Sequence, residues 1–142
     1  MDLAIVIFLL GGLFLGWSLG SNDAANVFGT AVGTRMVRFK TAAIVCSLFI
    51  ILGAVISGSG TTETLGKLGA INALPGAFAA CVAAGLSVYI MTKFGLPVST
   101  TQAIVGAIVG WNIYTGSSIN IKILFIILST WVLCPIIAAL IA

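Results

Sequence analysis

Long apolar runs separated by short polar segments dominate the chain. A helix that crosses the hydrocarbon core of a bilayer needs about 20 predominantly apolar residues, and most of the runs reach or approach that length. The runs cover residues 3–34, 41–57, 73–92, 97–111 and 121–142. The pattern predicts an all-α membrane protein built as a polytopic helical bundle.

Two of these runs do not fit a simple crossing. As one straight helix, residues 3–34 would measure about 48 Å, well over the hydrocarbon thickness of about 30 Å. Residues 20–23, Gly-Ser-Asn-Asp, each favour turns or caps, so we expect the helix to be broken there. The run 97–111 is too short to cross and follows a Gly-Leu-Pro break and a Ser-Thr-Thr cap signature. We therefore expect it to be a re-entrant half-helix, buried in protein or lining a cavity.

Composition supports the membrane assignment. Of the 142 residues, 61% are hydrophobic and 6% are charged, whereas a soluble domain carries roughly 25% charged residues. Arg35, Arg38 and Lys40 fall in one short segment, which the positive-inside rule predicts to be cytoplasmic. The polar segment 58–72 is then external, and the N-terminus is extracellular or periplasmic. We expect a multi-pass protein of the cell membrane, and the net charge of +3 gives no indication of nucleic acid binding.

Asp23 is an acidic residue inside an apolar run. A carboxylate at membrane depth costs about 2.5–3.5 kcal/mol, so such groups usually face a cavity and have a partner. Asn22 and Asn26 flank it, and their amide oxygens together with the carboxylate make a hard-oxygen site suited to sodium. Two alternatives stay open: a proton neutralises Asp23, or Asp23 caps a helix at the membrane surface.

A second polar group stands at residues 99–102, where hydroxyl and amide groups offer donors and acceptors without charge. Helices that start near Asp23 and Thr101 would both present N-terminal N–H groups, and such ends bind anions, phosphate above all. Secondary transporters hold substrate and coupling ion between discontinuous helices of this kind. An anion beside Asp23 is repelled unless a cation lies between them, so the binding of the two would be coupled.

These two segments resemble signatures of a known family. Residues 20–35, GSNDAANVFGTAVGTR, resemble the G-A-N-D-V-A-N-A motif of the inorganic phosphate transporter (PiT) family of sodium- or proton-coupled carriers. Residues 97–110, PVSTTQAIVGAIVG, resemble its P-x-S-x-T-H-x-x-x-G-x-x-x-G motif. The resemblance implies an inverted-repeat carrier, usually a homodimer, of which residues 1–142 would be the N-terminal repeat and the C-terminal half would lie outside this chain.

The resemblance also implies a set of site residues. The phosphate ligands would be Asn22, Ser99, Thr100, Thr101 and Gln102. The sodium ligands would be Asn22, Asp23, Asn26 and Thr101. The chain departs from the family pattern at Gln102, where the family usually has His. Because Gln does not titrate, sodium is favoured over a proton as the coupling ion.

We therefore predict a secondary transporter that imports inorganic phosphate with sodium. An anion channel and a proton-coupled phosphate carrier are the alternatives. An enzyme is disfavoured. Intramembrane aspartyl proteases need two Asp, and only Asp23 lies within an apolar run. Intramembrane serine proteases need a base, and the chain has no His. For the same reason we expect no zinc or iron site and no cofactor beyond sodium as the coupling ion. The expected partners are phosphate, sodium, the lipid bilayer and the missing half.

Overall fold

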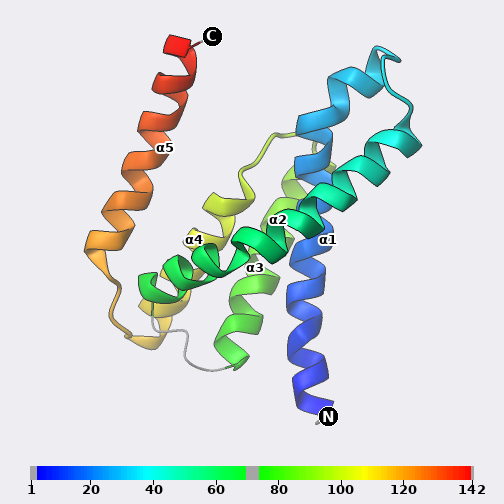
Figure 1. The fold of residues 1–142 in the computed structure, drawn as a ribbon. Coiled ribbons are helices and arrows are strands. Elements are labelled where there is room, and N and C mark those ends of the chain that lie inside the picture. The colour runs from blue at the N-terminus through cyan, green and yellow to red at the C-terminus, as the bar shows by residue number, and fades with distance from the viewer. Residues whose placement is uncertain (1–2, 70–73, 142) are drawn as a thin grey trace.

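Five α-helices make up the computed structural model, which describes residues 3–69 and 74–141 (Figure 1). They are α1 Leu3–Gly33, α2 Phe39–Leu68, α3 Leu74–Lys93, α4 Thr100–Thr115 and α5 Ile121–Ile141. All except α4 are long and apolar enough to cross a membrane. The described residues include no strand element, only an isolated β-bridge between Gly69 and Ile119. The prediction of an all-α, polytopic helical membrane protein is confirmed.

The expected break near residues 20–23 is wrong, because α1 is one helix of 31 residues. Ser21 and Asn22 of this segment find partners without interrupting the helix. The Ser21 hydroxyl donates to the Ser18 carbonyl at 2.8 Å, and the Asn22 amide contacts α3. Backbone N–H groups in the middle of a helix bond to the carbonyl four residues before them. α1 therefore presents no helix N-terminus beside Asp23, and the alternative that Asp23 caps a helix is also wrong.

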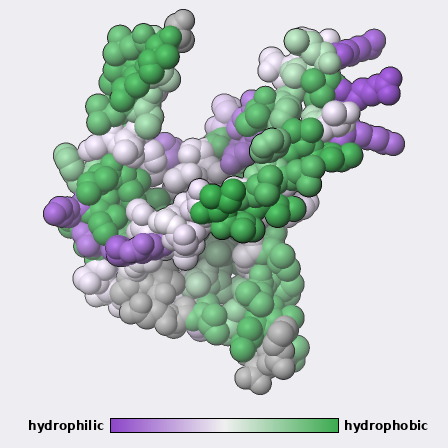
Figure 2. All heavy atoms as spheres, viewed as in Figure 1, coloured by the Kyte–Doolittle hydropathy of each residue, from purple (hydrophilic) through white to green (hydrophobic). Residues whose placement is uncertain are grey.

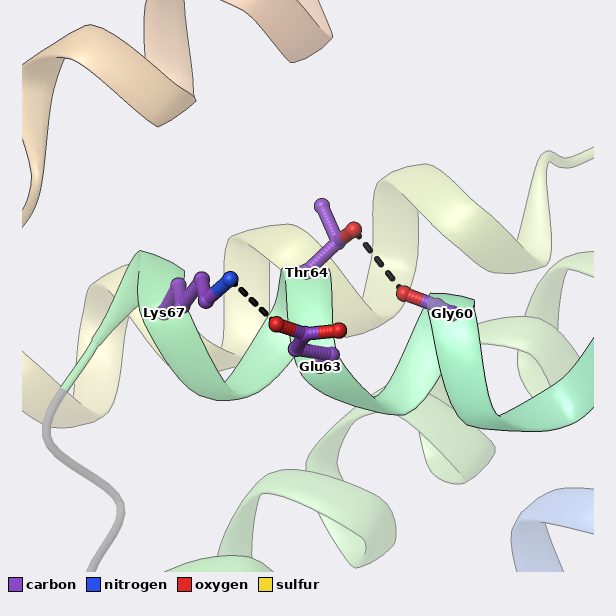
Figure 3. Close-up of polar contacts among 4 residues, drawn as sticks. All are labelled: Gly60, Glu63, Thr64 and Lys67. Carbon is purple, nitrogen blue, oxygen red and sulfur yellow. Dashed lines mark hydrogen bonds and ion pairs between the residues drawn. The ribbon is translucent and has the colours of Figure 1, made fainter.

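The second difference concerns α2, which continues through most of the segment expected to be an external connection. Instead of ending at residue 57, the helix ends at Leu68. Its polar side chains are satisfied within the helix, as Figure 3 shows. The Thr64 hydroxyl donates to the Gly60 carbonyl at 2.9 Å, and Lys67 forms an ion pair with Glu63 one turn away. Residues 70–72 of the expected connection, and residue 73 of the next predicted span, lie outside the described residues.

Close packing joins α1 to α3, and the two helices run parallel. Phe8 lies against Phe78 with ring centroids 5.8 Å apart, and further along both helices Trp17 lies against Tyr89 at 5.6 Å. A Cβ atom placed on Gly85 would come within 2.8 Å of the Phe14 ring. A small residue is therefore required at position 85, as in other closely packed membrane helices.

α4 runs back along α3, so the two form a helical hairpin. Trp111, near the end of α4, packs on Gly76, near the start of α3, where a Cβ atom would lie 2.8 Å from the indole Nε1. The two helices share a small buried cluster with the end of α2, made of Leu68, Ala80, Val105 and Ile108. The tip of the hairpin, residues 94–99, is thereby held beside the middle of α1.

The first half of α5 packs against this buried cluster, whereas its end projects away from the other helices and none of its described residues is buried (Figure 1). The visible surface of the helices is largely apolar, whereas hydrophilic side chains project from the turn between α1 and α2 (Figure 2). The exposed basic residues of that turn are Arg35, Arg38 and Lys40. α3 and α5 match the predicted apolar runs 73–92 and 121–142. α4 overlaps the predicted half-helix 97–111 but begins at Thr100 and extends to Thr115. Whether α4 is re-entrant in a bilayer stays a prediction.

Candidate functional site

A polar pocket lies where the middle of α1 faces the tip of the α3–α4 hairpin. Its volume is about 520 Å³. Both polar segments singled out in the sequence contribute to it, although they are some 75 residues apart in the chain. The lining residues are Asp23, Asn26, Val27, Pro97, Val98, Ser99, Thr100 and Thr101.

Ser99 defines the start of α4. It has extended backbone angles, φ −86° and ψ 115°, and its hydroxyl oxygen accepts from the N–H of Gln102 at 3.3 Å. Capping of this kind stabilises a helix start and satisfies one of the first four N–H groups. The N–H groups of Thr100 and Thr101 also lie in the first turn, where no helical carbonyl precedes them. The positive end of the α4 dipole is therefore at the pocket, as expected for an anion site.

The partner of the Asp23 carboxylate is Thr100. The Thr100 hydroxyl donates to Asp23 Oδ2 at 2.9 Å, and this side chain is only 7% exposed. The carboxylate is itself partly buried. A carboxylate accepts about four hydrogen bonds or cation contacts, so this contact leaves Asp23 with capacity to bind a ligand in the pocket.

Asn22 lies behind the pocket rather than in its lining, and it is 5% exposed. One atom of its amide is 2.9 Å from Thr92 Oγ1. The other is 2.9 Å from the Val98 carbonyl oxygen and 3.2 Å from Asp23 Oδ1. Asn22 thus contacts the end of α3, the hairpin tip and the neighbouring carboxylate. Thr92 was missed in the sequence, because only the parallel register of α1 and α3 brings it to Asn22.

The other residues predicted for the site divide into two groups. Asn26 and Thr101 line the pocket and are exposed, and the Asn26 amide is 3.1 Å from that of Asn22. Gln102 is exposed but is not among the lining residues. Of the seven predicted ligands, five therefore line one pocket: Asp23, Asn26, Ser99, Thr100 and Thr101.

The pocket combines groups for a cation with groups for an anion. Asp23 and the Asn26 amide oxygen are hard-oxygen ligands, whereas the hydroxyls and first-turn N–H groups of α4 are donors. In residues 3–69 and 74–141, no three His, Cys, Asp or Glu side chains gather into a group that would hold a metal ion. The arrangement suits a monovalent cation that binds beside an anion, rather than a multi-carboxylate metal centre.

The site lies away from the basic turn. α1 continues for ten residues beyond Asp23 before it ends at Gly33, which is about 15 Å of helix at 1.5 Å per residue. The turn with its three exposed basic side chains follows. Asp23 is therefore separated from the basic turn by nearly three helical turns of α1.

Comparisons with known proteins identify a family of similar chains. The model of the phosphate transporter family matches residues 19–142, which include both sides of the pocket. The chain is 38% identical over its whole length to a protein of Thermococcus kodakarensis named "Putative phosphate permease TK2061". Across 94% of the chain it is 32% identical to "Inorganic phosphate transporter 2-1, chloroplastic" of Arabidopsis thaliana. No solved structure matches.

The relatives are longer than this chain. The match covers 37% of the Thermococcus kodakarensis protein and 25% of the Arabidopsis thaliana protein. A model that matches from residue 19 to residue 142 nevertheless takes in most of the chain and both polar segments. On this ground, and with four apolar helices long enough to cross a bilayer, the chain is a multi-pass membrane protein that belongs to the phosphate transporter family.

Proposed function

We propose that this chain supplies one half of the binding site of a secondary transporter that imports inorganic phosphate together with sodium. The observation that carries the proposal is the contact between Asp23 and Thr100, 2.9 Å long, across the pocket. It joins a carboxylate in the middle of one apolar helix to the N-terminus of another. A cation ligand and an anion ligand therefore lie within one hydrogen bond of each other.

Phosphate would bind at the N-terminus of α4. The donors there are the first-turn N–H groups and the hydroxyls of Ser99 and Thr101, and the helix dipole favours negative charge. Thr100 differs from its neighbours, because its hydroxyl is already engaged with Asp23. Its N–H group is still available, so Thr100 would contact phosphate through the backbone and the sodium site through its side chain.

Sodium would bind to Asp23 and Asn26. Both line the pocket, and both offer oxygen ligands. At about 4 Å two unit charges interact by roughly 4 kcal/mol at an effective dielectric constant of 20, so an anion close to an unneutralised Asp23 is strongly disfavoured. Sodium on Asp23 turns that repulsion into attraction. Sodium would therefore bind before phosphate, which couples the transport of phosphate to that of sodium.

This proposal differs from the sequence-based expectation in two details. The N-terminus of α4 would be the helix end that binds the anion, because α1 is continuous and has no N-terminus near Asp23. Asn22 would act through Asp23 rather than as a direct ligand, because its amide is buried against Thr92 and Val98. Gln102 would reach phosphate only if the completed site approaches α4 from the side on which that residue is exposed.

The pocket is open, and in the part of the chain that the structure describes its lining residues come from α1 and from the hairpin. We propose that a second, inverted repeat closes it, because carriers of this kind expose a site to each side in turn by moving two pseudo-symmetric halves against each other. The basic turn is cytoplasmic in this arrangement. The homodimer implied by the family resemblance remains a prediction.

The decisive experiment is uptake of radiolabelled phosphate into proteoliposomes that contain the complete transporter. Sodium and proton gradients are imposed separately. We expect saturable uptake that depends on sodium. Uptake driven only by a proton gradient would replace sodium by a proton as the coupling ion, and flux that does not saturate would indicate a channel.

Asp23→Asn is the variant that tests the site. It keeps the shape and the contact with Thr100, but removes the charge that sodium needs. An interaction with a charged group contributes about 1.5–3 kcal/mol, so uptake at limiting sodium should fall by at least about tenfold. Unchanged uptake with unchanged sodium dependence would contradict the assignment of Asp23.

A further inference from the structure

Thr92, in the last turn of α3, contacts the candidate site from behind. Its hydroxyl is 2.9 Å from the amide of Asn22, a residue 70 positions earlier in the chain. Asn22 is 5% exposed and Thr92 is partly buried. Water therefore has little access to this contact, and the two side chains must satisfy each other.

The neighbours of Asn22 determine how its amide is oriented. With Nδ2 toward Thr92, the amide oxygen would face the Val98 carbonyl at 2.9 Å and Asp23 Oδ1 at 3.2 Å, which are both acceptors. With the amide turned over, Nδ2 donates to both of these oxygens and Oδ1 accepts from the Thr92 hydroxyl. The second orientation matches two N–H donors to two acceptors. The Asn26 amide is 3.1 Å away and exposed, and with Asn22 turned over it must present its oxygen rather than Nδ2 to Asn22.

We infer that Thr92 is a positioning residue for the cation site: its hydroxyl fixes the Asn22 amide, and that amide orients the Asp23 carboxylate. The inference rests on the proposed function. Asp23 Oδ1 then accepts from Asn22 and Oδ2 accepts from Thr100, so one donor holds each oxygen. The lone pairs that remain are directed by these two contacts, and the carboxylate is pre-organised for a cation in the pocket.

The same amide joins the two sides of the site. The Val98 carbonyl belongs to the hairpin tip, and Asn22 belongs to α1. Thr92 therefore stabilises the position of the tip as well as the orientation of the carboxylate. Loss of its hydroxyl leaves the buried Oδ1 atom without its donor, which favours rotation of the amide away from Asp23. The cation site becomes less ordered although no cation ligand has been removed.

Thr92→Val tests the inference, because valine keeps the shape of threonine and lacks the hydroxyl. Thr92→Ser retains the hydroxyl and should rescue the wild-type behaviour. Ser87→Ala is the matched control on the same helix, since the exposed Ser87 hydroxyl donates only to the Ala83 carbonyl one turn before it, at 2.9 Å. Each variant is made in the complete transporter, and its yield and monodispersity are measured after purification.

The measurement is the initial rate of radiolabelled phosphate uptake into proteoliposomes at increasing sodium concentration. We expect Thr92→Val to raise the half-saturating sodium concentration about tenfold, the effect of one lost hydrogen bond in a network with a charged group. The maximal rate per folded protein should change far less. Thr92→Ser keeps the hydroxyl donor, and Ser87→Ala changes an exposed site where substitutions usually have small effects, so both should stay within about twofold of wild type.

The possible outcomes distinguish a failure of the role inferred for Thr92 from a failure of the proposed sodium-coupled phosphate transport. A wild-type half-saturation in Thr92→Val, or a loss that affects only the maximal rate, would show that Thr92 is merely structural and would overturn the inference. A failure of Thr92→Ser to rescue would do the same. If Thr92→Val does not fold, Thr92→Ala removes the same hydroxyl with less bulk and is measured in its place. An unmodified transporter that shows no sodium-dependent phosphate uptake would instead refute the proposed function, and the inference with it.

Discussion

The hydrogen bond between Thr100 and Asp23 makes the sharpest prediction, because it is the direct link between α4 and α1 in the pocket. Thr100→Val removes the hydroxyl and keeps the branched shape of a side chain that is 7% exposed. The backbone of residue 100, and with it the first-turn N–H group, is unchanged. The Ser99 cap is also untouched. The substitution therefore acts on the carboxylate rather than on the start of the helix.

The magnitude follows from the type of hydrogen bond. The donor is a hydroxyl and the acceptor a carboxylate, 2.9 Å apart and partly buried. A hydrogen bond to a charged group contributes about 1.5–3 kcal/mol, which corresponds to a factor of about 10 to 150 in an equilibrium constant. If the bond positions the carboxylate for sodium, the half-saturating sodium concentration should rise by a factor in this range. The KM for phosphate at saturating sodium should change less.

Uptake of radiolabelled phosphate as a function of sodium concentration measures this effect. Thr100→Ser keeps the hydroxyl and should retain sodium dependence close to wild type. Thr115→Val is a matched control at the other end of α4, where the exposed hydroxyl bonds the Trp111 carbonyl at 3.0 Å. A Thr100→Val transporter with normal sodium dependence, or a Thr115→Val transporter with an equal defect, would refute the reasoning.

Two further predictions concern Gln102 and the orientation of the helices. Gln102→His should leave uptake insensitive to pH between about 5.5 and 7.5, the range in which His titrates, because Gln102 is not among the residues that line the pocket; a new pH dependence would show that this residue joins the completed site. Single cysteines at Met36 and Thr62, in a background without native cysteines, test the topology. A membrane-impermeant thiol reagent applied to intact cells should label position 62 and not 36, and the reverse pattern would invert the orientation.

The sequence by itself determined the class of the protein and most members of its site. The shortage of charge and the length of the apolar runs already require a helical membrane protein. The isolated Asp23 and the Ser-Thr-Thr segment identified both sides of the pocket, because polar groups at membrane depth are costly unless they serve a site. The start of α4 was also predictable, since Ser99 is a preferred capping residue ahead of an apolar run.

The continuity of α1 and α2 became evident only in the three-dimensional structure. Residue preferences indicated a break at residues 20–23 and a connection after residue 57, but propensity is a weak influence that local and tertiary contacts override. In α1, Ser21 bonds a carbonyl of its own helix and Asn22 bonds Thr92 of α3. In α2, Glu63 and Lys67 pair within one turn. These contacts satisfy polar groups that the sequence alone suggested would interrupt a helix.

Only the tertiary structure revealed which residues act together. The contact between Asp23 and Thr100 spans 77 positions, and that between Asn22 and Thr92 spans 70. Both accompany the parallel register of α1 and α3, in which Gly11 lies close to Phe78 and Gly85 lies close to Phe14. No local pattern encodes that register, because it results from the shapes of two helices packed against each other. For this reason most residues that line the pocket could be predicted from the sequence, whereas Thr92, which contacts Asn22 from α3, could not.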